Sequence, residues 1–206
     1  MENKITLYGA SGHAKVIIDI LKTASIAIEN IIDDNPKTET ILGIEIIKSQ
    51  NFDFKNLKNT IISIGNNGVR KVLSAKLKVV FVKAIHPSAI ISKFASIGEG
   101  TVIMAGAIIN PEAKIGNHCI INTAAVIEHD CIIDNFAHIS PSASLAGNVI
   151  VGEGAHIGIG ATIIQGIKIG KWTTIGAGAI IIKDVPDYAV VVGNPGRIIK
   201  YNKQND

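Results

Sequence analysis

Glu128, His129 and Asp130 are consecutive, so one imidazole stands between two carboxylates. A histidine beside a carboxylate gains basicity and is held in one tautomer, which is what a general base needs near neutral pH. Neighbouring side chains on a strand point to opposite sides, but side chains at a corner of the chain can meet. The tripeptide therefore predicts a general base at His129 supported by a flanking carboxylate, and the alternative is a solvated polar corner.

A glycine-containing turn near the N-terminus could bind phosphate. Residues 4–8 predict a short buried strand, the turn from Gly9 to His13 follows, and residues 14–24 carry apolar side chains at helical spacing. Backbone N–H groups at the start of a helix attract phosphate, and glycine allows close approach. The turn from Gly9 to His13 is therefore a candidate phosphate-binding loop. The spacing is not that of the dinucleotide motif, and an ordinary strand-to-helix turn is the alternative.

Two further features extend this α/β pattern. A second strand over residues 29–34 ends in Asp33 and Asp34, where such folds contact a ribose or base; a solvated turn is the alternative. Residues 41–47 predict an extra strand or hairpin. A third strand over 60–64 leads into a glycine-rich loop that begins at Gly65 and precedes a helix over 69–77.

The elements that follow are set by a repeat of period six. From Ile85 to Ile181 an aliphatic residue returns every six positions, and a mostly small residue lies four positions after each. Such hexapeptide repeats predict a parallel β-helix with the aliphatic residues inside. Three hexads make one coil, so residues 18 apart stack and seventeen hexads give between five and six coils. Glycines directly after the aliphatic, such as Gly98 and Gly116, are expected at corners that need a positive φ.

The register of this repeat predicts where four of the histidines and both cysteines lie. His118 and His129 fall at corners, whereas His138 and His156 are 18 apart and should stack on one face. Cys119 and Cys131 belong to the small set, which favours two buried hydrophobes over a disulfide, a metal pair or a nucleophile. No metal is expected.

The expected architecture is a Rossmann-like α/β domain over residues 1–84 and an all-β parallel β-helix with a C-terminal capping tail over 85–206. A flat sheet face is an aggregation hazard unless it is covered, so a closed oligomer is expected. The 20 basic and 17 acidic residues are too balanced and dispersed to indicate nucleic-acid binding. No apolar stretch is long enough to span a membrane and the N-terminus lacks a signal-peptide pattern, so a cytoplasmic protein is expected.

The motifs together resemble a known family. The stretches YGASGH, IIDD, SIGNN, NTAAVIEHD, FAHISPSASLAGNV and VVVGNPGR cover nearly the whole chain. They are similar to those of the left-handed β-helix sugar acetyltransferases, typified by the bacterial UDP-4-amino-sugar N-acetyltransferase of bacillosamine synthesis. The left-handed coil is implied by this resemblance alone.

The resemblance implies a homotrimer that transfers acetyl from acetyl-CoA to the amino group of a nucleotide-linked 4-amino-4,6-dideoxy sugar, with UDP favoured. His129 would be the general base and Asp130, which is Glu in some relatives, would raise its basicity. Acetyl-CoA would contact His138 and the backbone near Ile159 and Ala177. The nucleotide sugar would contact a second group, made up of Ser11, Gly12, His13, Asp33, Asp34 and Gly65.

Other functions remain open. An O-acetyltransferase acting on a sialic acid or another sugar would use the same histidine and carboxylate, as would a GDP-perosamine N-acetyltransferase. A zinc enzyme of the carbonic-anhydrase type would need three histidines converging across a subunit interface. A nucleotide-sugar-binding regulator would need no catalysis at all.

Overall fold

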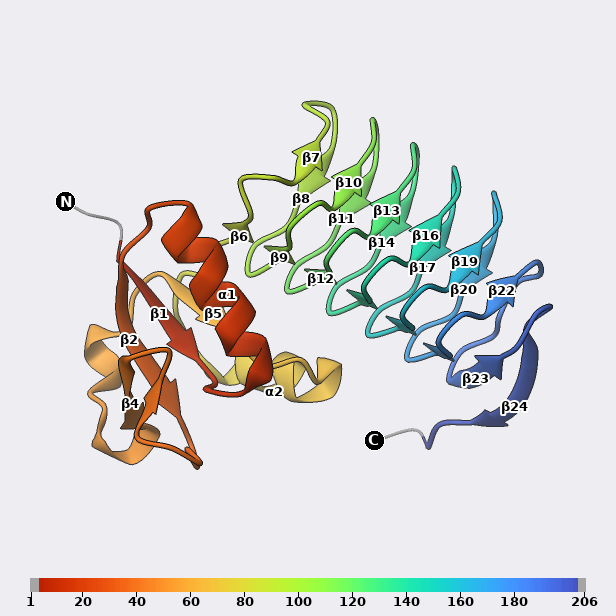
Figure 1. Cartoon of the computed structure of the whole chain (residues 1–206). Coiled ribbons are helices and arrows are strands. Elements are labelled where there is room, and N and C mark those ends of the chain that lie inside the picture. The colour runs from red at the N-terminus through yellow and green to blue at the C-terminus, as the bar shows by residue number, and fades with distance from the viewer. Residues whose placement is uncertain (1–3, 204–206) are drawn as a thin grey trace.

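A computed structural model describes residues 4–203, which form an α/β domain followed by a long β-helix (Figure 1). The α/β sheet has the strand order β3-β4-β2-β1-β5. β1 is parallel to β2 and to β5, β2 is parallel to β4, and β3 pairs antiparallel with β4. The strands are β1 (Ile5–Tyr8), β2 (Ile28–Asp33), β3 (Thr40–Ile41), β4 (Ile44–Lys48) and β5 (Thr60–Ile62).

Alternation along β1 divides the two faces of this sheet. Ile5 and Leu7 pack against α1 (Gly12–Thr23) on one face. Tyr8 lies in a second cluster with Leu73 of α2 (Asn67–Lys76) on the other face. Two short 3₁₀ turns, η1 (Ser49–Asn51) and η2 (Phe54–Asn56), connect β4 to β5. The expected strands, hairpin and helices are therefore confirmed, with boundaries shifted by one or two residues.

The β-helix consists of seventeen two-residue strands, β6 to β22, joined by tight corners. Each strand pairs in parallel with the strand 18 residues away, as Ile108 does with Val126. The strands therefore form three flat sheets, β6-β9-β12-β15-β18-β21, β7-β10-β13-β16-β19-β22 and β8-β11-β14-β17-β20. The coil of three hexads is confirmed. The strands run at 84–85, 90–91, 96–97, 102–103, 108–109, 114–115, 120–121, 126–127, 132–133, 138–139, 144–145, 150–151, 156–157, 162–163, 168–169, 174–175 and 180–181.

The interior is filled by the two sets that the repeat predicts. Ile121, Ile139 and Ile157 are completely buried on successive coils, and the small residues Ala125 and Ala143 are buried beside them. At the C-terminal end, β23 (Ala189–Val192) pairs in parallel with β21. The chain then reverses, and β24 (Arg197–Tyr201) pairs antiparallel with β23 (Figure 1). The capping tail thus extends one sheet of the β-helix.

The expected reason for the glycines after the aliphatic positions was wrong. Gly98 and Gly116 do not have a positive φ; that conformation falls two residues later, at Gly100 and at His118. A Cβ on Gly98 would lie 2.5 Å from the carbonyl carbon of Gly116, one coil away. These glycines are needed because adjacent coils approach too closely for a side chain.

The α/β domain packs on the first sheet of the β-helix. Val102 of β9, Met104 just after it and Ile120 of β12 join the cluster formed by α1. Asn67 at the start of α2 donates to the carbonyls of Gly154 and Ala155, at 3.0 and 3.3 Å. The α/β domain is therefore fixed to one face of the triangular β-helix and to the edge beside it.

Candidate active site

His129 and Asp130 meet at the corner between β13 and β14. Asp130 has a φ of 60°, which turns the chain sharply. Its Oδ2 lies 2.7 Å from Nδ1 of His129, and both side chains are more than half exposed. Because a carboxylate can only accept, Nδ1 carries the hydrogen and Nε2 keeps its lone pair. The predicted contact is present, and the pair has the geometry of an oriented general base.

The two glycine-rich loops of the α/β domain lie together. β1 has β2 on one side and β5 on the other, so the crevice at the carboxyl ends of β1 and β5 is the switch point where such sheets bind ligands. The buried Ser63 hydroxyl donates to the Gly9 carbonyl at 2.6 Å and joins the loops. His13 lies close to Gly65, because a Cβ on that glycine would be 4.0 Å from the Cβ of His13. Ser11 and Gly12 are exposed beside them.

Asp33 and Asp34 have separate tasks, because adjacent side chains at a strand end diverge. Asp33 accepts from the backbone N–H of Ala10 at 2.7 Å and of Asn35 at 2.8 Å, so it holds the glycine turn in place. Asp34 instead accepts from the Tyr8 hydroxyl at 2.6 Å. Asp34, and not Asp33, lines the pocket described next.

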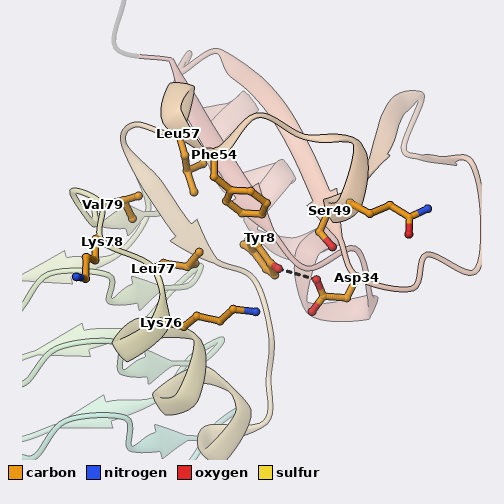
Figure 2. A pocket seen from close by; sticks show the side chains of 10 residues that line it. Tyr8, Asp34, Ser49, Phe54, Leu57, Lys76, Leu77, Lys78 and Val79 are labelled. Atoms are coloured by element: carbon orange, nitrogen blue, oxygen red, sulfur yellow. Dashed lines mark hydrogen bonds between the residues drawn. The ribbon is translucent and has the colours of Figure 1, made fainter.

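The pocket beside Asp34 has a volume of about 540 Å³ (Figure 2). Phe54 and Leu57 give it apolar walls, and Lys76 extends into it from the end of α2. Hydrogen bonds from Tyr8 and Ser49 lower the pKa of Asp34, and burial together with Asp34 raises the pKa of Tyr8 to about 12. The pocket therefore offers an anionic acceptor beside an aromatic wall, which suits the N–H groups and flat ring of a nucleobase.

Arg70 on α2 is a residue that the sequence did not indicate. It is only 1% exposed and donates to carbonyls from both parts of the chain. Its Nε contacts the carbonyl oxygen of His118 at 2.8 Å and its Nη2 that of Phe136 at 2.8 Å. Its Nη1 donates to the carbonyls of Ile64 and Gly65, at 3.1 and 3.2 Å. Arg70 thus fixes the Gly65 loop to the β-helix.

Histidines line the junction between the α/β domain and the first sheet of the β-helix. His138 and His156 are stacked, with ring centroids 4.7 Å apart, as the register predicts. Burial, followed by the effects of His156, Arg70 and His13, lowers the pKa of His138 to about 3. Burial and Arg70 lower the pKa of His13 to about 4. These imidazoles are therefore neutral at physiological pH.

His138 is oriented by a neighbouring amide. The Nδ2 of Asn122 lies 3.0 Å from Nε2 of His138, so that ring nitrogen accepts and Nδ1 carries the hydrogen. Nδ1 of His138 and Nε2 of His13 are both buried, and neither has a hydrogen-bond partner within residues 4–203. A buried polar atom without a protein partner calls for one, and a water molecule or a ligand group can supply it.

The remaining predicted acetyl-CoA contacts, Ile159 and Ala177, lie along the edge of the β-helix that follows its first sheet. Ile159 and Ala177 are exposed, and they occupy equivalent corners one coil apart, after β18 and β21 respectively. His138 and His156 lie on the sheet that leads into this edge. The structure therefore places His138, Ile159 and Ala177 along one side of the β-helix.

The structure does not bring His129 to the other candidates within one chain. The corner of His129 separates the second sheet from the third, whereas the α/β domain covers the first. In a triangular cross-section that corner lies opposite the first sheet. Ser11, Gly12 and His13 are therefore on one side of the molecule and the His129–Asp130 pair is on the other.

Two further findings concern metals and membranes. Within residues 4–203, no group of three or more His, Cys, Asp or Glu side chains is arranged to hold a metal ion. None of the helices in that part of the chain is long and apolar enough to be a transmembrane helix.

Both cysteines are free and buried, and burial raises the pKa of the Cys119 thiol to about 12.

Comparisons with known proteins agree with this two-part organisation. Residues 4–77 match the PglD N-terminal domain, and residues 94–127 match the bacterial transferase hexapeptide (six repeats). A UDP-N-acetylbacillosamine N-acetyltransferase of Bacillus subtilis (strain 168) is 46% identical over 111 residues. That match covers 49% of this chain and spans about half, 51%, of the length of this curated relative.

Solved structures match over nearly the whole chain. One of them is a histidine-to-asparagine mutant of perosamine N-acetyltransferase from Caulobacter crescentus, in complex with CoA and GDP-perosamine. It is 36% identical to this chain, its TM-score is 0.91, and the match covers 97% of this chain and 98% of that one. The acetyltransferase domain of PglB from Neisseria gonorrhoeae FA1090, in complex with acetyl coenzyme A, is 33% identical with a TM-score of 0.88, covering 97% and 100%. The resemblance and the fold class predicted from the sequence are thus confirmed: the chain belongs to the left-handed β-helix sugar N-acetyltransferases with a PglD-type N-terminal domain.

Proposed function

We propose that this protein transfers the acetyl group of acetyl-CoA to the amino group of a nucleotide-linked 4-amino-4,6-dideoxy sugar. The observation that carries the proposal is the 2.7 Å contact between Nδ1 of His129 and Asp130, which leaves Nε2 free at an exposed corner. The named activities of the bacillosamine and perosamine relatives support the same reaction class.

The chemistry follows from this orientation. The lone pair of the sugar amine attacks the thioester carbonyl carbon and forms the new C–N bond. Nε2 of His129 accepts the proton that the amine loses, while the carboxylate of Asp130 stabilises the imidazolium that results. The tetrahedral intermediate then collapses, the C–S bond breaks and CoA leaves as a thiolate. Backbone N–H groups of the β-helix supply the donors for the oxyanion. No nucleophilic side chain is required.

The two substrates are assigned to different parts of the chain. In this proposal residues 1–84 hold the nucleotide sugar, with Ser11, Gly12, His13 and Gly65 at the switch-point crevice. Asp34 reaches the nucleoside in the adjoining pocket, and Asp33 supports the turn from behind. The free polar atoms of His13 and His138 suit ligand groups that meet at the junction between the domains.

Residues 85–206 are assigned to acetyl-CoA. Its extended chain would run beside His138 and then along the edge marked by Ile159 and Ala177. These two residues are exposed at equivalent corners one coil apart, which suits a long ligand lying parallel to the β-helix axis.

We further propose that the active form is a homotrimer in the cytoplasm. One chain separates His129 from the Ser11–His13 turn by the width of the β-helix, so a neighbouring copy is needed to bring a His129 against the first sheet. A closed ring of three triangular prisms would place the His129 corner of each copy beside the His138 face of the next.

The named relatives differ in the nucleobase of their sugar nucleotide. The Bacillus subtilis protein is named for a UDP sugar, and the Caulobacter crescentus structure contains GDP-perosamine. UDP is favoured by the 46% identity to the former, and GDP-perosamine is the second candidate because the latter matches 97% of this chain.

A thiol-release assay tests the proposal. Purified protein is supplied with acetyl-CoA and a panel of amino- and hydroxyl-bearing UDP and GDP sugars, and the product is identified by mass spectrometry. We expect CoA release with a 4-amino sugar nucleotide and an increase of one acetyl group in the product. Acetylation of hydroxyl acceptors alone would indicate an O-acetyltransferase instead. Binding without turnover would indicate a regulator, and about one zinc ion per subunit, measured on the same sample, would favour a metalloenzyme.

A further inference from the structure

Gly147 is a glycine that the fold itself does not require. Glycines within the repeat otherwise fall at the second hexad position, where the next coil leaves no room, or at the fourth, where φ is positive. Gly147 occupies the third position, counting from the aliphatic Leu145, and is the only glycine there. Its φ lies outside the left-handed region, so a side chain would cause no backbone strain.

The atoms closest to Gly147 belong to the candidate base. A Cβ built on Gly147 would lie 2.6 Å from Cε1 and 2.7 Å from Nε2 of His129, with Nδ1 third at 3.2 Å. His129 is 18 residues earlier, so the two residues occupy the same corner of adjacent coils. The backbone N–H of Asn148 donates to the carbonyl of His129 at 2.9 Å, which fixes these corners relative to one another.

We propose that Gly147 is a positioning residue: it leaves open the space in which the His129 ring lies and keeps Nε2 accessible to the sugar amine. This inference rests on the proposed role of His129 and adds to it. Carbon atoms in contact are normally about 3.5–4.0 Å apart, so a methyl group at residue 147 would displace the ring by on the order of 1 Å. The ring would then lose its alignment with Asp130, the approach to Nε2, or both.

The test is a double-mutant cycle with Gly147→Ala and His129→Ala, measured as kcat and KM with acetyl-CoA and the best amino sugar from the panel. A misplacement of about 1 Å can cost on the order of 100-fold in rate. We expect Gly147→Ala to lower kcat at least tenfold in the wild-type background, with the KM for acetyl-CoA changed less than threefold. In the His129→Ala background the same substitution should change kcat less than threefold, because the ring it displaces is absent.

Two controls separate positioning from damage to the fold. Lys93→Ala is the control, since the exposed Lys93 occupies the same hexad position at the same corner two coils before His129, and its kcat should stay within twofold of wild type. The thermal midpoint of Gly147→Ala should match that of wild type. Its His129 Cε1 resonance, observed by NMR in histidine-labelled protein, should move.

The outcomes distinguish this inference from the proposed function. A kcat for Gly147→Ala within twofold of wild type, or an equal fold loss in both backgrounds, would overturn the positioning role while leaving His129 as the base. If His129→Ala itself kept the wild-type rate, the proposed base would fail, and the positioning role with it.

Discussion

Replacing Arg70 by methionine should lower the free energy of unfolding more than replacing an exposed residue that also bridges the two domains. The guanidinium is 1% exposed, and within residues 4–203 it forms no ion pair with a carboxylate. Burial lowers its pKa to about 10, so it remains charged at neutral pH. It is held instead by carbonyl oxygens at the domain junction. Its loss therefore removes the hydrogen bonds that join the Gly65 loop to the β-helix.

The magnitude follows from the groups left behind. Arg70→Met leaves four backbone carbonyl oxygens without this donor, those of Ile64, Gly65, His118 and Phe136, and it also removes the hydrogen bond from Nη2 to Oδ1 of Asn67. Each costs about 1 kcal/mol at the low end of the range, because water can enter the vacated space. Removing a buried charge returns part of that cost. We expect a net loss of roughly 2–4 kcal/mol, which lowers the thermal midpoint by roughly 5–15 °C in a chain of this size.

Lys71→Met provides the matched control for this measurement. Lys71 is the next residue on α2 and also bridges the domains, through an ion pair with Glu153, but its side chain is 47% exposed. Exposed ion pairs contribute about 1 kcal/mol or less. Circular-dichroism melts of both variants at one protein concentration and scan rate provide the comparison. If Arg70→Met melted within 2 °C of Lys71→Met, the interpretation of Arg70 as the connection between the domains would be refuted.

Three further predictions concern the histidines, the cysteines and the pocket. Burial lowers the pKa of His118 to about 4, so between pH 6.5 and 4 the unfolded chain binds a proton that the folded chain does not. His118 should therefore make stability decrease as the pH is lowered through this range, by up to about 1.4 kcal/mol per pH unit. His118→Phe should reduce the slope of the urea-unfolding profile by that amount and leave the slope that His13 and His138 cause. Cys119 and Cys131 should not react with Ellman's reagent until the protein is unfolded, and a double alanine variant should remain active; rapid labelling of the native protein would contradict their buried positions. Asp34→Ala should raise the KM for the nucleotide sugar at least tenfold and leave that for acetyl-CoA unchanged, whereas an unchanged nucleotide KM would place the nucleoside elsewhere.

Most of the β-helix could be predicted from the sequence, because its period depends only on neighbours 6 and 18 residues away. The register alone placed His138 over His156 and both cysteines inside. Arg70 could not be found in this way. The segment VRKVL is typical of an exposed helix face, and nothing in it shows that carbonyls from the two parts of the chain converge on one of its cations.

Two features depend on contacts that the sequence pattern does not show. The glycines after the aliphatic positions were assigned to backbone conformation, although close contact between coils is what requires them. The sequence names Asp33 and Asp34 together, whereas in the structure Asp33 accepts from the backbone of the glycine turn and Asp34 from the Tyr8 hydroxyl. Gly147 carried a usable signal, since it departs from both glycine positions of the repeat, but its meaning depends on where the His129 ring lies.

The most direct test of the central claim is the single-turnover rate of acetyl transfer by His129→Gln at saturating acetyl-CoA and amino sugar nucleotide. Glutamine keeps a polar side chain beside Asp130 but cannot accept the proton of the amine. A general base contributes about 10²- to 10⁴-fold, so the rate should fall at least 100-fold while the affinity for CoA, measured by calorimetry, stays within threefold of wild type. A rate within threefold of wild type would contradict the assignment of His129 as the base.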